Sequence, residues 1–131
     1  MTLVEAQQKS ESKIEALLRW RSLERRVVAI NCAQKALSSL REEGVEAAVI
    51  GSLAAGNFML HSDVDYLVCG DVSIERRGSI EAAIGRAMSS SGIGYDIVYS
   101  EDIKLEYMED FCRAKLNASD LSYLAQEAGK S

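Results

Sequence analysis

The sequence predicts an α+β fold, with a small mixed β-sheet, helices packed on one face of it, and a long N-terminal helix. Three observations lead to this fold class. Apolar residues recur at steps of three, four or seven from residue 3 to about residue 43, which is a helical pattern. Short apolar runs at 45–50, 64–69 and 93–100 are typical of strands. An amphipathic stretch at 79–90 indicates a further helix between the last two runs.

The length and composition set the broad class of protein. A chain of 131 residues is long enough for one domain with a core of its own. We expect residues 1–43 to form a helical segment and residues 44–131 to form the core and the C-terminal helices. No apolar run approaches the roughly 18–20 residues that span a bilayer, and the N-terminus lacks the pattern of a signal peptide. We therefore expect a cytoplasmic protein with no membrane partner.

The net charge and the cysteines argue against two classes of partner. The net charge is −5, and the basic clusters are too short to form the stripe that follows a phosphate backbone. We therefore expect no long nucleic acid as a partner. Cys32, Cys69 and Cys112 are accompanied by a single histidine, and their spacing fits neither a zinc site nor a disulfide framework. They are expected to be apolar packing residues.

The N-terminal helix is the first expected element, and Gly44 is placed to end it as a C-terminal cap. About forty residues of amphipathic helix exceed what a three-stranded sheet needs for cover. A protein partner, or self-association into a homo-oligomer through this helix, would use the excess. An equally weighted alternative is a helix that breaks near residue 20, so that its two halves fold back on each other.

The other elements are expected in the order strand, helical turn, strand, helix, strand, helix, helix. Their expected bounds are 45–50, 52–57, 64–69, 79–90, 93–100, 106–115 and 119–127. Ser119 or Asp120 is the expected N-cap of the last helix.

Two aspartates at the start of the second strand are the first candidate site residues. Asp63 and Asp65 are two positions apart, so their side chains project from the same side of a strand. Two carboxylates placed so closely repel each other and are costly to bury without a cation. Mg²⁺ resolves this conflict, because it takes one or two carboxylates and completes its shell with water and phosphate oxygens. The pair therefore predicts a magnesium site.

A glycine-rich turn upstream provides the candidate phosphate site. Gly51 and Ser52 end the first strand and open a turn of small residues. Glycine lets the backbone approach a phosphate, N–H groups at the start of a helical turn attract anions, and the serine hydroxyl adds a hydrogen bond. Gly56 and Asn57, at the end of the same turn, complete the expected nucleotide-binding residues.

A third acid is expected on the neighbouring strand. Asp96 is a lone charge in the β-branched and aromatic run Gly94–Val98. Tyr95 and Ile97 would then point the other way, towards the core. Asp96 is thus the candidate third ligand of a three-carboxylate metal site.

These residues resemble the minimal nucleotidyltransferase family, whose small members belong to the DNA polymerase β-like superfamily. The motif reads GSLAAGNFMLHSDVDYLV, followed about thirty residues later by YDIV. The resemblance implies a palm-like fold with ATP or another nucleoside triphosphate as substrate and two Mg²⁺ ions during turnover. It implies that Asp63, Asp65 and Asp96 are metal ligands and catalytic residues. Gly51 and Ser52 would hold the β- and γ-phosphates, and Asp96 would also deprotonate the attacking hydroxyl.

The same resemblance implies an antitoxin that transfers AMP to a tyrosine of a partner protein, a small helical ribonuclease toxin. The sequence departs from the family where Leu53 and Ala55 replace the arginines of the usual Gly-Ser-Arg-Ala-Arg-Gly run. Arginines there supply bidentate phosphate contacts. Arg86 and Lys104 are the candidate cations that would replace them. One alternative is a weak or inactive binding module that neutralises a partner by contact. Another is a transferase acting on a small molecule or a tRNA 3′ end.

Overall fold

The computed structural model describes residues 11–128, so the part of the expected N-terminal helix that precedes residue 11 lies outside the described residues. The described chain confirms the α+β fold class. Its elements are α2 (Lys13–Glu42), β1 (Ala47–Ile50), α3 (Gly51–Ala55), β2 (Val64–Val68), α4 (Ile74–Met88), β3 (Tyr95–Tyr99), the 3-10 turn η1 (Ser100–Asp102), α5 (Leu105–Phe111) and α6 (Ala118–Ala128).

The sheet is mixed, as expected, with the strand order β1-β2-β3. β1 is antiparallel to β2, and β2 is parallel to β3. The parallel pair needs a crossover connection, and α4 supplies it. On the free edge of β1, Val49 and Leu116 form an isolated antiparallel bridge, with N···O distances of 2.8 and 2.9 Å, that attaches the segment between α5 and α6 to the sheet.

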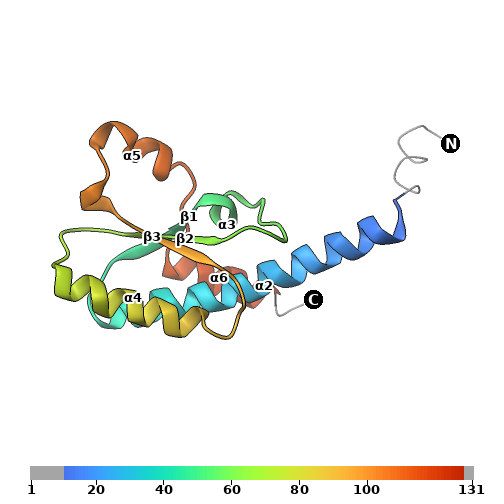
Figure 1. Ribbon diagram of the computed structural model, residues 1–131, viewed down its shortest axis with the longest axis horizontal. Coiled ribbons are helices and arrows are strands. Elements are labelled where there is room, and N and C mark those ends of the chain that lie inside the picture. The colour runs from blue at the N-terminus through green and yellow to red at the C-terminus, as the bar shows by residue number, and fades with distance from the viewer. Residues whose placement is uncertain (1–10, 129–131) are drawn as a thin grey trace.

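The helices divide between the two sides of the sheet (Figure 1). α2 and α4 lie together beneath it, and α6 packs against α2. α5 stands on the opposite side, attached by its two ends, with α3 beside the sheet at the end of β1. The expectation of helices on one face therefore holds for the large helices, while short α5 leaves the other face partly open.

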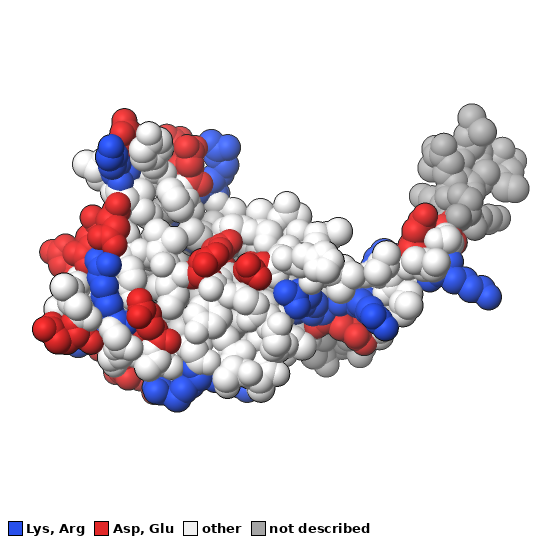
Figure 2. All heavy atoms as spheres, in the orientation of Figure 1, with Lys and Arg blue, Asp and Glu red and all other residues white. Residues whose placement is uncertain are grey.

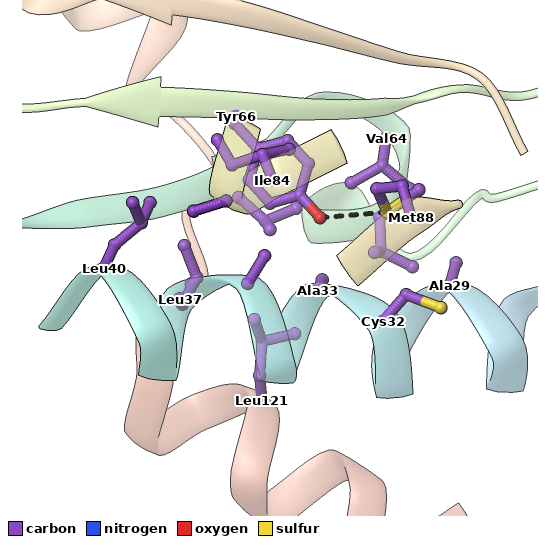
Figure 3. Close-up of a cluster of buried hydrophobic side chains, with 14 of the residues drawn as sticks. Ala29, Cys32, Ala33, Leu37, Leu40, Val64, Tyr66, Ile84, Met88 and Leu121 are labelled. Carbon is purple, nitrogen blue, oxygen red and sulfur yellow. Dashed lines mark hydrogen bonds between the residues drawn. The ribbon is translucent and has the colours of Figure 1, made fainter. Parts of the chain in front are cut away.

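The core lies between the sheet and these helices (Figure 3). Val64, Tyr66 and Val68 are alternate residues of β2 and face α2 and α4. Tyr66 is fully buried, and its hydroxyl donates to the Met88 sulfur at 3.2 Å. Burial raises the pKa of this phenol far above its usual range. Leu121 of α6 enters the same cluster from beyond α2, so α2 is packed on more than one side.

Helix α2 is continuous over its whole described length, so the alternative of a helix broken near residue 20 is wrong. The Ser12 hydroxyl caps its start by accepting from the Glu15 N–H at 3.0 Å. Its end also follows the prediction, because Gly44 directly follows the C-cap with a φ of +77°. Burial begins only at Ala29, and the preceding part of the helix extends away from the body (Figure 1).

The start of α4 and the N-cap of α6 differ from the sequence prediction. α4 begins at Ile74, earlier than expected, because the Ser73 hydroxyl accepts from the Arg76 N–H and caps the helix there. α6 begins at Ala118, and its cap is Asn117, not Ser119 or Asp120. Asn117 Oδ1 accepts from the Asp120 N–H, and Asp120 Oδ2 accepts from the Asn117 N–H, both at 2.9 Å. This reciprocal arrangement is a capping box.

The three cysteines differ in how far they are buried. Cys32 is buried, Cys69 and Cys112 are half-buried, and all three are free thiols. Burial is the main cause that raises the pKa of the Cys69 thiol. Among residues 11–128, no helix is both long and apolar enough to cross a membrane.

Candidate functional site

The junction between β1 and α3 brings the backbone of Gly51 against an acidic side chain. Ile50, the last residue of β1, is the register partner of Asp65. Gly51 follows with a φ of +72°, and a Cβ placed there would overlap the Asp65 carboxylate oxygen Oδ2. Only glycine satisfies both conditions, because other residues rarely adopt this φ and all of them carry a Cβ. The glycine of the predicted phosphate turn and the second aspartate of the predicted metal pair are thus in direct contact.

Asp65 and Asp96 are register partners on the parallel strands β2 and β3. Neighbouring strands lie about 4.8 Å apart, so the two carboxylates start from adjacent positions. They share the face of the sheet that points away from the core, because Tyr66 and Ile97 pack on the core side. Burial raises the pKa of the Asp65 carboxyl, and repulsion from Asp96 and then from Asp63 adds to the shift. As predicted, Tyr95 points to the other side, where its ring meets that of Tyr66 edge-on.

Asp63 lies just before β2 and leans towards the β3 side of the site. A Cβ at Gly94 would lie 2.6 Å from Asp63 Oδ1, so a side chain at this position would force the Asp63 carboxylate to move. The neighbouring Val64 N–H donates to the Gly94 carbonyl at 3.0 Å. The three predicted aspartates are therefore grouped on one face, at the ends of β2 and β3 that lie near α3.

Arg25, which the sequence motif does not include, holds the loop before Asp63. From α2, Arg25 Nη2 donates to the Ser62 carbonyl at 2.9 Å, and its guanidinium lies 5.8 Å from the centre of the Phe58 ring. Its buried Nε has no hydrogen-bond partner among the residues that the structure describes. Arg25 and Ser62 are 37 positions apart, and a single sequence contains no signal for such a contact.

The fit to a metal ion is partial. Within residues 11–128, no three His, Cys, Asp or Glu side chains converge into a ready ligand set. Mg²⁺ does not need such a set, because it binds through one or two carboxylates together with water and phosphate oxygens. The adjacent carboxylates Asp65 and Asp96 match that requirement, and burial, followed by repulsion from Asp96 and Asp63, raises the pKa of the Asp65 carboxyl. The three-carboxylate metal centre thus stays a prediction.

A cavity of about 310 Å³ joins the phosphate turn to α5. From the turn it is lined by Gly51, Ser52, Ala55 and Asn57, and from the end of α5 by Asp110, Phe111, Arg113 and Ala114. Three of the four predicted nucleotide-binding residues therefore border one cavity. Gly56, the fourth, has a φ of +84°, caps α3, and lines a different hollow beneath the exposed part of α2.

The two positions where the resembled family has arginine differ from each other in the structure. Leu53 is only 2% exposed and belongs to the hydrophobic core, so its side chain does not face the cavity. Ala55 lines the cavity but carries no charge. Neither Arg86 nor Lys104, the substitutes considered from the sequence, borders it, whereas Arg113 does. Figure 2 shows small acidic groups in a largely uncharged central part of the visible face, with most basic groups at its periphery.

An ion-pair network around Arg77 supports the end of β3 that lies farther from the aspartates. Arg77 of α4 pairs with Glu101 at 2.7 Å and with Asp102 at 2.8 Å, and its guanidinium stacks 4.0 Å from the Tyr99 ring centre. Hydrogen bonds from Arg77 lower the pKa of both carboxyls. Glu101 also accepts from the Val72 N–H at 3.0 Å. This network connects η1 to α4 and is structural.

Comparison with known proteins supports the fold. No family model matches the sequence, and no curated protein matches it. Among solved structures, a crystal structure of a toxin-antitoxin with AMP-PNP superimposes with a TM-score of 0.50. The two chains are 15% identical, and the match covers 73% of this chain and 82% of the other. The described chain therefore shares its α+β fold with a chain of a toxin-antitoxin structure that was determined with a nucleotide analogue.

Proposed function

We propose that this protein is a Mg²⁺-dependent nucleotidyltransferase that transfers a nucleoside monophosphate, AMP from ATP, to a hydroxyl group. The observation that carries the proposal is the contact between the Gly51 backbone and Asp65, whose strand neighbour is Asp96. A phosphate turn and two adjacent carboxylates meet at one point of the sheet. The solved structure with the same fold contains AMP-PNP, an analogue of ATP, which favours a nucleotide as the ligand here.

Each site residue has a role in this reaction. Gly51 and Ser52 bind the triphosphate, and Gly56 and Asn57 shape the turn that carries them. The acceptor hydroxyl oxygen forms a bond to the α-phosphorus, the bond from that phosphorus to the bridging oxygen breaks, and pyrophosphate leaves. Asp96 accepts the proton of the hydroxyl group. Mg²⁺ held by Asp63, Asp65 and Asp96 would neutralise charge on the phosphates, which is the main catalytic requirement of such transfers.

The proposed acceptor is a tyrosine of a partner protein, a toxin in a toxin-antitoxin pair. The structure with the same fold is a toxin-antitoxin, and this chain has a surface suited to a protein partner. Ile14, Leu17 and Trp20 are about half exposed or more along the part of α2 that lies beyond the core. Trp20 and the neighbouring arginines are residue types that anchor interfaces. We propose that the partner contacts this part of α2.

Incubation with ATP labelled on the α-phosphate, MgCl₂ and the product of the adjacent gene tests the proposal. The wild-type protein should add one or more AMP groups of about 329 Da each to a tyrosine of that partner, as read by mass spectrometry. Asp65→Asn should abolish the addition, and Asp71→Asn, which changes an exposed carboxylate outside the site, should not. An unmodified partner, or equal modification by wild type and Asp65→Asn, would refute the catalytic role.

A second candidate is a binding module that neutralises its partner by contact alone. Leu53 and Ala55, which stand in place of arginines, favour it, because the turn offers no cation of its own to a triphosphate. Calorimetry with ATP and MgCl₂ separates the candidates. The transferase requires ATP binding that depends on Mg²⁺, and a contact-only module does not require it. The contact-only module would also bind its partner equally well in the absence of ATP and when Asp65 is replaced by Asn.

A further inference from the structure

The cavity beside the phosphate turn contains a basic side chain that the sequence motif does not include. Arg113 follows α5 and borders the same cavity as Gly51 and Ser52. Its side chain is 77% exposed and therefore accessible to a ligand. Leu53 and Ala55 leave the turn itself without a cation. The positive charge on the cavity wall therefore comes from Arg113, in a distant part of the chain.

Arg113 is held in place from one side. Its Nη2 donates to Asp110 Oδ1 at 3.1 Å, and both residues line the cavity. An arginine carries five N–H donors in a planar fork, so this single bond leaves donors for a ligand. Asp110 thus orients the guanidinium and leaves most of its N–H donors available. Such an arrangement suits phosphate, which arginine binds through two parallel hydrogen bonds.

The cavity wall also includes an aromatic ring. Phe111, which lies between Asp110 and Arg113 in the sequence, is partly exposed and borders the same cavity. Nucleobases stack on such rings. The cavity therefore combines a glycine turn, a guanidinium and an aromatic face, which together match the phosphate and base parts of a nucleotide.

We propose that Arg113 is the phosphate-binding cation of this protein and replaces the arginines that the turn lacks, with Asp110 as its positioning residue. The proposal rests on the proposed function, because it assigns the triphosphate to this cavity. It also assigns α5 a role: this short helix brings Arg113 to the turn from the open side of the sheet. A nucleoside triphosphate is the ligand class.

Equilibrium binding by calorimetry tests the proposal without a partner protein or turnover. The probes are ATP, AMP and adenosine, each with MgCl₂. Arg113→Ala should weaken ATP binding by about tenfold or more, since a hydrogen bond between charged groups is lost. The effect should be smaller for AMP and absent for adenosine. Arg113→Lys should recover part of the ATP affinity, because it keeps the charge but not the fork.

Lys104→Ala is the matched control, because Lys104 is also an exposed cation next to α5 but does not border the cavity. It should leave the ATP affinity within about twofold of wild type. If Arg113→Ala binds ATP as tightly as Lys104→Ala does, or weakens adenosine and ATP equally, the assignment of Arg113 is wrong while the proposed function stands. If the wild-type protein shows no Mg²⁺-dependent ATP binding, both are wrong.

Discussion

The carboxylate of Asp65 lies where a side chain at position 51 would begin, so Gly51 and Asp65 constrain each other. The turn can approach the acidic strand only because position 51 has no Cβ, and the left-handed φ of Gly51 reinforces the requirement. Gly56 provides a comparison, since it also has a positive φ but has no neighbouring atom within 4 Å of an added Cβ.

Gly51→Ala should therefore destabilise the protein more than Gly56→Ala. A positive φ costs a residue with a Cβ roughly 1–2 kcal/mol, which is the cost expected for Gly56→Ala. At position 51 the overlap with Asp65 adds to this, so we expect a loss above about 2 kcal/mol in the free energy of unfolding by urea denaturation. Equal losses for the two variants would show that the contact with Asp65 is not a constraint.

The raised pKa of Asp65 predicts how stability depends on pH. Burial and the neighbouring carboxylates favour the protonated form in the folded state. The ionised carboxylate therefore destabilises the fold fully above the folded-state pKa, and the penalty disappears as the pH falls from that value towards the unfolded-state value. Asp65→Asn should raise the Tm at pH 7, with a gain that shrinks as the solution is acidified.

The control for this effect is Asp71→Asn, an exposed site for which no gain in Tm at pH 7 is expected. MgCl₂ should raise the Tm of the wild-type protein at pH 7 and have less effect on Asp65→Asn, because the cation would offset the same negative charge. A lower Tm for Asp65→Asn at pH 7 would contradict the prediction.

The capping box of α6 predicts a local loss of stability. Asn117→Ala removes the side-chain acceptor for the Asp120 N–H and should cost about 1 kcal/mol. Ser119→Ala changes an exposed residue in the first turn of the same helix and should cost less than about 0.5 kcal/mol. Chemical denaturation of both variants checks the difference, and a larger loss for Ser119→Ala would restore the cap predicted from the sequence.

The hydroxyl of Tyr66 should contribute little to stability although it is fully buried. Its acceptor is the Met88 sulfur, and thioether sulfur is a weak acceptor. Tyr66→Phe should change the free energy of unfolding by less than about 1 kcal/mol, whereas Tyr66→Ala should cost about 3–5 kcal/mol through the cavity it leaves. A large loss in Tyr66→Phe, measured in urea, would assign the hydroxyl a structural role.

Trp20 is the only tryptophan of the chain and is 59% exposed on α2. Trp20→Ala should leave the free energy of unfolding within about 0.5 kcal/mol of wild type, whereas Leu37→Ala in the core should cost about 2–5 kcal/mol. The fluorescence of Trp20 should shift to shorter wavelength when the proposed partner binds. Partner binding without a shift, and with equal affinity for Trp20→Ala, would place the interface elsewhere.

The strands and large helices could be predicted because their signals are local. Val64, Tyr66 and Val68 face the core while Asp63 and Asp65 face away from it, and this alternation is visible in the sequence. The start of α4 lacks such a local signal. Residues 74–79 contain no buried side chain, so no apolar periodicity marks the first turn, and the only local signal is the cap at Ser73.

The contacts that complete the site could not be predicted, because they join distant parts of the chain. Asp65 and Asp96 were expected to lie on neighbouring strands, and the parallel register confirms that placement. Arg25 and Arg113, however, are ordinary helix-associated arginines in the sequence. Their relation to Ser62 and to the phosphate turn depends on how α2 and α5 pack, which no spacing within a motif encodes.

The parallel pairing of β2 and β3 has a consequence for how the site forms during folding. Asp65 and Asp96 become neighbours only when the α4 crossover brings β3 alongside β2, and contacts between residues so far apart in sequence form slowly. A chain that ends before residue 95 retains the glycine turn, Asp63 and Asp65, yet it lacks the strand that completes the acidic face. During synthesis, the acidic face can therefore be completed only once β3 has been made.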